Sequence, residues 1–142
     1  NPQDSGKAFV GISPTAGYDF PFQVDINLGE DIGGPSAGLM FALGIYDTLT
    51  PGELTGGKHI AGTGTMTSDG EVGPIGGIQQ KIVAADDEGA SVFLTPADNC
   101  AEALGARNGD VQLVKVETLE DGVSAVQAVA SGKTSDLPRC TR

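Results

Sequence analysis

Gly33-Gly34-Pro35-Ser36-Ala37-Gly38 places one serine among small residues, immediately before an apolar run. The apolar side chains of that run recur at helical spacing, Pro35 suits a position in the first helical turn, and Thr50-Pro51-Gly52 ends the pattern. We therefore expect a helix over residues 36–49, with Ser36 in its first turn above the buried face.

A helix start of this kind suits a nucleophile, because its unpaired backbone N–H groups can stabilise an oxyanion. Pro35 has no N–H, so the predicted donors are Ser36 itself and Gly33 or Gly34. A serine hydroxyl also needs a neighbouring base to take its proton. The alternative is that Ser36 only caps the helix.

Lys81 is the candidate base. It lies in a second helical pattern over residues 78–88, beside the apolar stripe of that pattern, so we expect its amine to lean inward. Burial disfavours the charged form of an amine, and a neutral amine can accept the serine proton. The alternative is an ordinary surface lysine with its stem on apolar surface and its amine in water.

Other motifs are weaker. Residues 34–38 fit the G-x-S-x-G nucleophile elbow with His59 as base, but that arrangement needs a larger sheet and a later histidine. Residues 52–58 follow phosphate-loop spacing up to the lysine, but His59 then stands where a hydroxyl residue should hold Mg²⁺ and no strand precedes the motif. We predict neither a metal nor a nucleotide cofactor.

Composition fits one globular domain spanning residues 1–142, with 39% apolar residues and a net charge of −11 that argues against nucleic-acid binding. No apolar run approaches the ~18 residues of a membrane span, and the polar residues 1–5 do not read as a signal peptide. Two cysteines, Cys100 and Cys140, are compatible with a disulfide or with two separate thiols.

Strand and helix patterns interleave along the whole chain, as in an α/β or α+β fold. Ser68-Asp69-Gly70 predicts a hairpin turn. We expect the tail, residues 131–142, to be loosely held. The predicted strands are 8–12, 23–28, 60–67, 71–75, 91–95 and 111–116, and the other predicted helices are 78–88, 97–104 and 119–130.

Taken together, the motifs resemble the proteolytic domain of Lon proteases over about residues 24–99. The matching stretches are Gly34-Pro35-Ser36-Ala37-Gly38, Thr63-Gly64 and Gly76-Gly77-Ile78-Gln79-Gln80-Lys81-Ile82-Val83-Ala84-Ala85. The resemblance implies an α+β Lon proteolytic fold, in which small mixed sheets pack with about four helices. It also implies a serine endopeptidase in which Ser36 is the nucleophile, Lys81 the general base and Thr63 a residue that orients the amine, acting through an acyl-enzyme.

Two departures from the family pattern qualify this resemblance. Gly33 stands where many Lon enzymes carry an aspartate, and the chain has no ATPase segment, so the resemblance favours an ATP-independent branch acting on flexible or unfolded polypeptides. Residues 31–43 and the Asn99-Cys100 step look like bacterial Lon-like proteases with a membrane anchor and a PDZ domain upstream. That branch implies an extracytoplasmic domain and a Cys100–Cys140 disulfide, and it leaves oligomer formation possible.

Two other functions remain open at this point. The chain could be a peptide-binding module of the same fold that does not hydrolyse its ligand. It could also be an esterase that uses Ser36 with His59.

Overall fold

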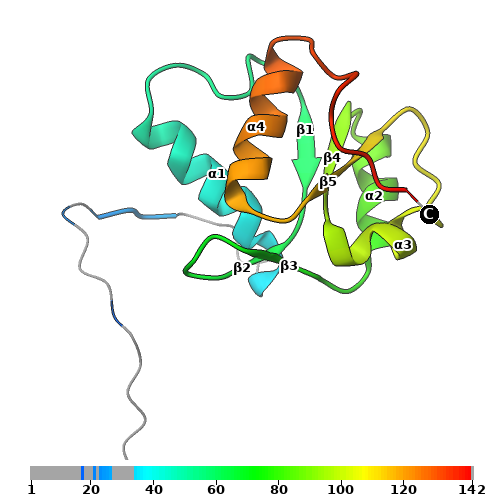
Figure 1. Ribbon diagram of the computed structural model, residues 1–142, viewed down its shortest axis with the longest axis horizontal. Helices are drawn as coiled ribbons and strands as arrows, with labels where there is room; N and C mark the ends of the chain where they lie inside the picture. The colour runs from blue at the N-terminus through cyan, green and yellow to red at the C-terminus, as the bar shows by residue number, and fades with distance from the viewer. Residues whose placement is uncertain (1–16, 18–20, 22, 27–33, 142) are drawn as a thin grey trace, which may run out of the picture.

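A computed structural model describes residues 17, 21, 23–26 and 34–141. Helices and strands alternate along the described chain, and Figure 1 shows how they are arranged. The elements are η1 (Pro35–Ala37), α1 (Gly38–Leu49), β1 (Ile60–Gly62), β2 (Thr65–Met66), β3 (Val72–Gly73), α2 (Ile78–Asp87), β4 (Val92–Pro96), η2 (Ala97–Asn99), α3 (Cys100–Ala103), β5 (Gln112–Val116) and α4 (Leu119–Ala130).

A parallel sheet forms the centre of the molecule. Its three strands lie in the order β1-β4-β5, with Gly62 opposite Leu94 and Leu94 opposite Val114. The connection from β1 to β4 contains the β2–β3 hairpin and α2, and the connection from β4 to β5 contains α3. Parallel neighbours require crossovers of this kind. All five residues of β4 are buried, as expected for a central strand covered on both faces.

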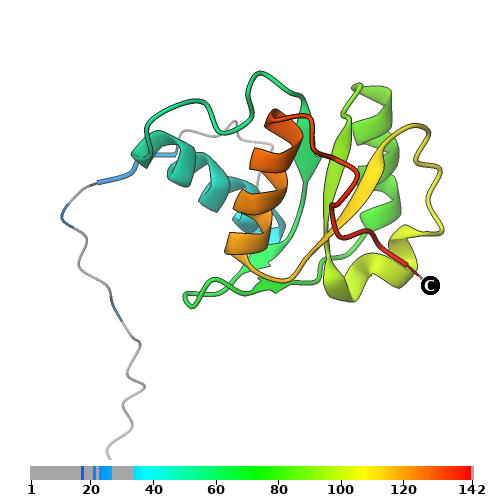
Figure 2. The ribbon, with the colours of Figure 1, turned by 45° about the horizontal axis from the view of Figure 1, so that its top comes forward.

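Helices cover both faces of the sheet, as Figure 2 shows from a second angle. Because side chains alternate along a strand, β4 sends Val92 and Leu94 to the face of α1 and α4, and Phe93 to the face of α2 and α3. β5 divides its side chains in the same way. The core therefore consists of two apolar layers, one on each side of the sheet.

The predicted hairpin is present, but the predicted strand 60–67 is divided. Its first part is β1 of the parallel sheet, and its second part, β2, pairs antiparallel with β3 around the turn at Ser68-Asp69-Gly70. Gly64 lies at the break. A Cβ at Gly64 would be 2.7 Å from a methyl carbon of Val72, so only glycine allows the chain to bend there.

Two of the predicted strands lie in the N-terminal part of the chain. Residues 23–26 of the predicted strand 23–28 form no paired strand, and the rest of that segment lies outside the described residues. The predicted strand 8–12 also lies outside them. The helices predicted over 36–49, 78–88 and 119–130 are present with nearly the predicted bounds, and 97–104 forms η2 and α3.

The C-terminal segment is held more firmly than the sequence predicted. The backbone N–H of Lys115 donates to Pro138, and that of Cys140 donates to Leu113, so residues 138–140 run along β5. Leu137 is buried in the core. The predicted disulfide between Cys100 and Cys140 is present, with the two Cα atoms 5.1 Å apart. The expectation of a loose tail was wrong for this part, because both backbone pairing and a covalent bond anchor it.

The mixed fold of helices and small sheets, in a single domain, agrees with the predicted class. Among the residues that the structure describes, no helix has both the length and the apolar character required to cross a membrane.

The disulfide is expected to stabilise the fold by about 2–4 kcal/mol, because it restricts the unfolded chain over a separation of 40 residues. Urea unfolding of a Cys100→Ser, Cys140→Ser double variant, compared with the wild type under oxidising conditions, measures this difference. The control is the same comparison under reducing conditions, where the wild type no longer has the disulfide. The stabilities of the two proteins should then differ by much less. Equal midpoints under oxidising conditions would contradict the prediction.

Candidate active site

Ser36 lies in the short turn η1, before α1. Gly34 precedes this turn with φ 84° and ψ 166°, a conformation that disfavours residues with a Cβ, and Pro35 takes the first position of the turn. The residue at the N-cap of α1 is Ala37, and no side chain caps either η1 or α1. The hydroxyl of Ser36 is therefore not used as a helix cap, which removes capping as the explanation for this residue.

The carbonyl of Ser36 is held by the end of β1. It accepts a hydrogen bond from the backbone N–H of Gly64 and another from the hydroxyl of Thr63, both at 2.8 Å. In return, the N–H of Leu39 donates to the carbonyl of Gly64 at 3.0 Å. Thr63 is only 3% exposed, so these bonds lie largely out of water. The serine turn is thus fastened to the sheet by three bonds.

Gly38 allows the serine turn to approach the hairpin this closely. A Cβ at this position would lie 3.0 Å from the backbone nitrogen of Met66 and 3.3 Å from the carbonyl oxygen of Gly64. Backbone atoms cannot yield as the end of a flexible side chain can. The small residue two positions after Ser36 is therefore a packing requirement.

Lys81 occupies the first turn of α2, where its N–H donates to the carbonyl of Gly77 at 3.3 Å. Ile78, Ile82 and Ala85 form the buried face of the helix, as predicted. The side chain of Lys81 is exposed, so the expected inward-leaning amine was wrong for this chain. Lys81 lies about 60° round the helix from Ile78, enough to take it off the buried face.

Lys81 lines a shallow cavity of 340 Å³ beside β1. Lys81 lines it together with Ala61 and Gly62 of β1, and Gly62 directly precedes Thr63, whose hydroxyl bonds the carbonyl of Ser36. β1 and the residue that follows it thus touch both elements: Gly62 lines the cavity together with Lys81, and Thr63 bonds the turn that carries Ser36. His59 and Glu88 also line this cavity.

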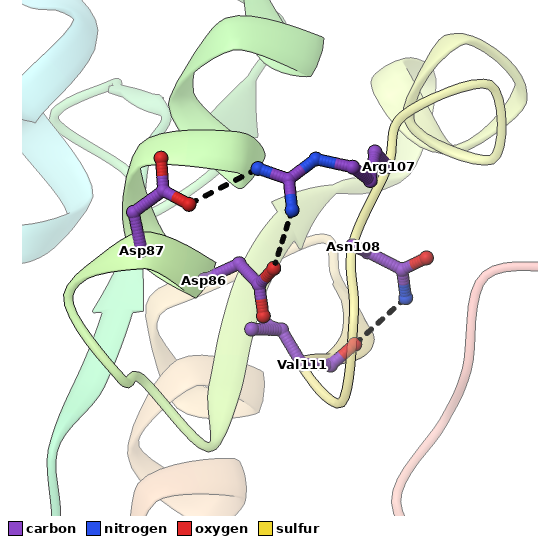
Figure 3. A network of polar contacts seen from close by, with 5 residues as sticks. All are labelled: Asp86, Asp87, Arg107, Asn108 and Val111. Atoms are coloured by element: carbon purple, nitrogen blue, oxygen red, sulfur yellow. Dashed lines mark hydrogen bonds and ion pairs between the residues drawn. The ribbon is translucent and has the colours of Figure 1, made fainter.

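The far end of α2 is tied by an ion pair, shown in Figure 3. Asp86 and Asp87 are in the last turn, where negative charges oppose the helix dipole. The guanidinium of Arg107 lies 3.5 Å from a carboxylate oxygen of Asp86 and 3.0 Å from one of Asp87. Because the Arg107 side chain is 65% exposed, water screens these pairs and they contribute little to stability.

The other predicted site residues are placed as follows. Thr63 contacts the Ser36 carbonyl, a bond that sequence spacing did not reveal because it joins residues 27 positions apart. Gly33, a predicted oxyanion donor, lies outside the described residues, whereas Gly34 lies directly before the serine turn. Within the described part of the chain, no group of three or more His, Cys, Asp and Glu side chains is arranged to hold a metal ion.

Comparison with known proteins shows the family to which the chain belongs. The family profile of the Lon protease (S16) C-terminal proteolytic domain matches residues 29–128, which include both the serine turn and α2. The chain belongs to this family. It is therefore a Lon-type proteolytic domain, and the recognition made from its motifs is confirmed.

Several Lon proteases are similar to this Lon-type domain. Lon protease 2 of Bacillus subtilis is 30% identical over 112 residues, covering 79% of this chain and 19% of the relative. The archaeal Lon protease of Methanothermobacter thermautotrophicus is 30% identical over 135 residues, covering 94% of this chain and 20% of the relative. The Lon protease of Campylobacter concisus is 37% identical over 93 residues, 62% of this chain and 11% of the relative. The chain thus spans at most about a fifth of these proteins.

Gly38→Ala should destabilise the domain by about 1–3 kcal/mol, because the new methyl group would push the serine turn away from Met66. Gly44→Ala is the matched control. Gly44 is exposed on the same helix, and a Cβ there would meet nothing within 4 Å, so alanine should stabilise the helix by about 0.5–1 kcal/mol. Thermal unfolding measures both, and a Gly38→Ala domain as stable as Gly44→Ala would contradict the close approach.

Proposed function

We propose that this Lon-type domain is a serine endopeptidase in which Ser36 is the nucleophile and Lys81 the general base. The observation behind the proposal is that two successive residues are linked to the two candidates: Thr63 bonds the carbonyl of Ser36, and Gly62 lines a cavity together with Lys81. Ser36 caps no helix, so its hydroxyl is free of that structural role. Membership of the Lon family supports the same reaction class.

The proposed reaction is acyl transfer. Lys81 Nζ takes the proton of Ser36 Oγ as that oxygen attacks the carbonyl carbon of a peptide bond, and the backbone N–H groups of Ser36 and Gly34 or Gly33 stabilise the oxyanion. The ammonium then returns the proton to the leaving amine. Water, deprotonated by the same lysine, hydrolyses the acyl-enzyme and frees Ser36.

Thr63 has a defined part in this scheme. Its single hydroxyl proton is donated to the carbonyl of Ser36, so only its lone pairs remain for Lys81. A neutral amine that donates an N–H to Thr63 keeps its own lone pair available for the serine proton. We therefore assign Thr63 to holding the serine turn and orienting the lysine together.

The exposed amine of Lys81 has a consequence for the substrate. Burial by the chain itself does not remove water from Lys81. A polypeptide bound over the cavity beside β1 would exclude water from the amine. This favours flexible or unfolded polypeptides, because an extended segment can lie along a shallow cavity of this kind.

ATP independence and an extracytoplasmic location are also part of the proposal. The phosphate-loop spacing at residues 52–58 follows α1 and precedes β1, whereas a phosphate loop joins a strand to a following helix. Disulfides such as Cys100–Cys140 persist mainly in oxidising compartments. A PDZ domain and membrane anchor in a longer protein are consistent with that location.

Ser36→Ala and Lys81→Ala should each abolish cleavage of a fluorogenic peptide or unfolded casein, because one removes the nucleophile and the other its base. Lys133→Ala is the matched control, since Lys133 is an exposed lysine beyond the end of α4 and should be replaceable. A fluorophosphonate probe should label the wild type but not Ser36→Ala.

Two results would overturn this function. Loss of activity in His59→Ala with full activity in Lys81→Ala would favour an esterase-type site. We include this test because His59 lines the same cavity as Lys81. Peptide binding without cleavage or probe labelling would favour a binding module.

Thr63→Val should lower kcat and cost about 1 kcal/mol of stability, because the Ser36 carbonyl loses one of its two donors. Thr63→Ser keeps the hydroxyl and should retain most of the activity. Peptidase kinetics and urea unfolding of the two variants measure these effects. Equal kcat values for the valine and serine variants would contradict a role for the hydroxyl.

A further inference from the structure

Asn99 is one of three buried polar residues in the described part of the chain, with 4% of its surface exposed. Its side-chain amide binds both backbone polar groups of one residue. The N–H of Ile75 donates to Asn99 Oδ1 at 2.8 Å, and Asn99 Nδ2 donates to the carbonyl of Ile75 at 3.0 Å. A side chain that satisfies both groups in this way replaces a neighbouring strand.

Ile75 lies in the short connection that leads into α2. Only Gly76 and Gly77 separate it from Ile78, the first residue of the helix, and both glycines are exposed. Gly77 has φ 70°, and a Cβ at Gly76 would meet nothing within 4 Å. Neither glycine has a side chain to pack, so side-chain packing holds this connection only through Ile75, which lies against the core. The pair of bonds from Asn99 supplies a fixed point shortly before the helical turn that carries Lys81.

Asn99 is itself held in place. It ends η2, which directly follows the fully buried strand β4. The next residue, Cys100, is buried and bonded to Cys140. The amide of Asn99 therefore projects from a firmly anchored part of the domain toward the connection that precedes α2.

We propose that Asn99 is a positioning residue for Lys81, an inference that rests on the proposed function. It acts through Ile75 by fixing where α2 begins, and so where the amine lies relative to Ser36. Hydrophobic packing of Ile78 and Ile82 keeps the helix against the core, whereas the Asn99 bonds define the position of its N-terminal end. Proton transfer is sensitive to this position, since a displacement of about 1 Å can cost about 10²-fold in rate.

Asn99→Ala should therefore lower kcat by about 10- to 100-fold while KM changes by less than about twofold. Asn108→Ala is the matched control. Asn108 Nδ2 also bonds a backbone carbonyl, that of Val111 at 2.9 Å, but in a loop near the far end of α2 (Figure 3). Its loss should leave kcat within about twofold of the wild type. Peptidase kinetics should be measured well below the unfolding temperature of each variant.

Hydrogen exchange gives a readout that does not depend on activity. The amides of residues 75–81 should exchange faster in Asn99→Ala than in Asn108→Ala, because only the first variant frees the connection before α2. Wild-type kcat in Asn99→Ala, or unchanged exchange at these amides, would overturn the inference while Ser36→Ala and Lys81→Ala remained inactive. If Lys81→Ala instead kept full activity, the proposed function would fail, and the positioning role would fail with it.

Discussion

The attachment of the Ser36 carbonyl to the end of β1 is the constraint on which this domain depends. Two donors, the Gly64 N–H and the Thr63 hydroxyl, hold that carbonyl at 2.8 Å, and the N–H of Leu39 returns a bond to Gly64. These bonds set the direction in which α1 leaves the serine turn. Leu39, which is fully buried, then leads the helix into the core layer on one face of the sheet.

The same strand also lines the cavity that Lys81 borders. β1 is tied to the fully buried β4, with Gly62 opposite Leu94, so the strand cannot shift without disturbing the centre of the sheet. A Cβ at Gly62 would lie 2.8 Å from both Leu94 and Met40. Close packing of the Gly62 backbone against these side chains thus fixes the position of β1. The cavity lined by Lys81 opens directly beside it.

Local patterns predicted the helices well because each helix carries its own signals. α4 has the predicted bounds, since Thr118 and Asp121 form a capping box at its start and its apolar face is periodic. The prediction of one continuous strand over residues 60–67 was wrong for a different reason. A chain that leaves one sheet and enters another within two residues shows no break in its hydrophobic pattern, and the decisive contact lies between Gly64 and Val72.

The amino-acid sequence alone determined the nucleophile and base candidates and the class of fold. Those conclusions depend on residue type and short-range spacing, which the chain displays directly. The tertiary structure alone decided that Thr63 bonds the Ser36 carbonyl, that Asn99 holds Ile75, that the tail runs along β5, and that Lys81 is exposed. Each of these depends on which segments meet in space, and contacts between distant segments arise from packing of the whole core rather than from any local pattern.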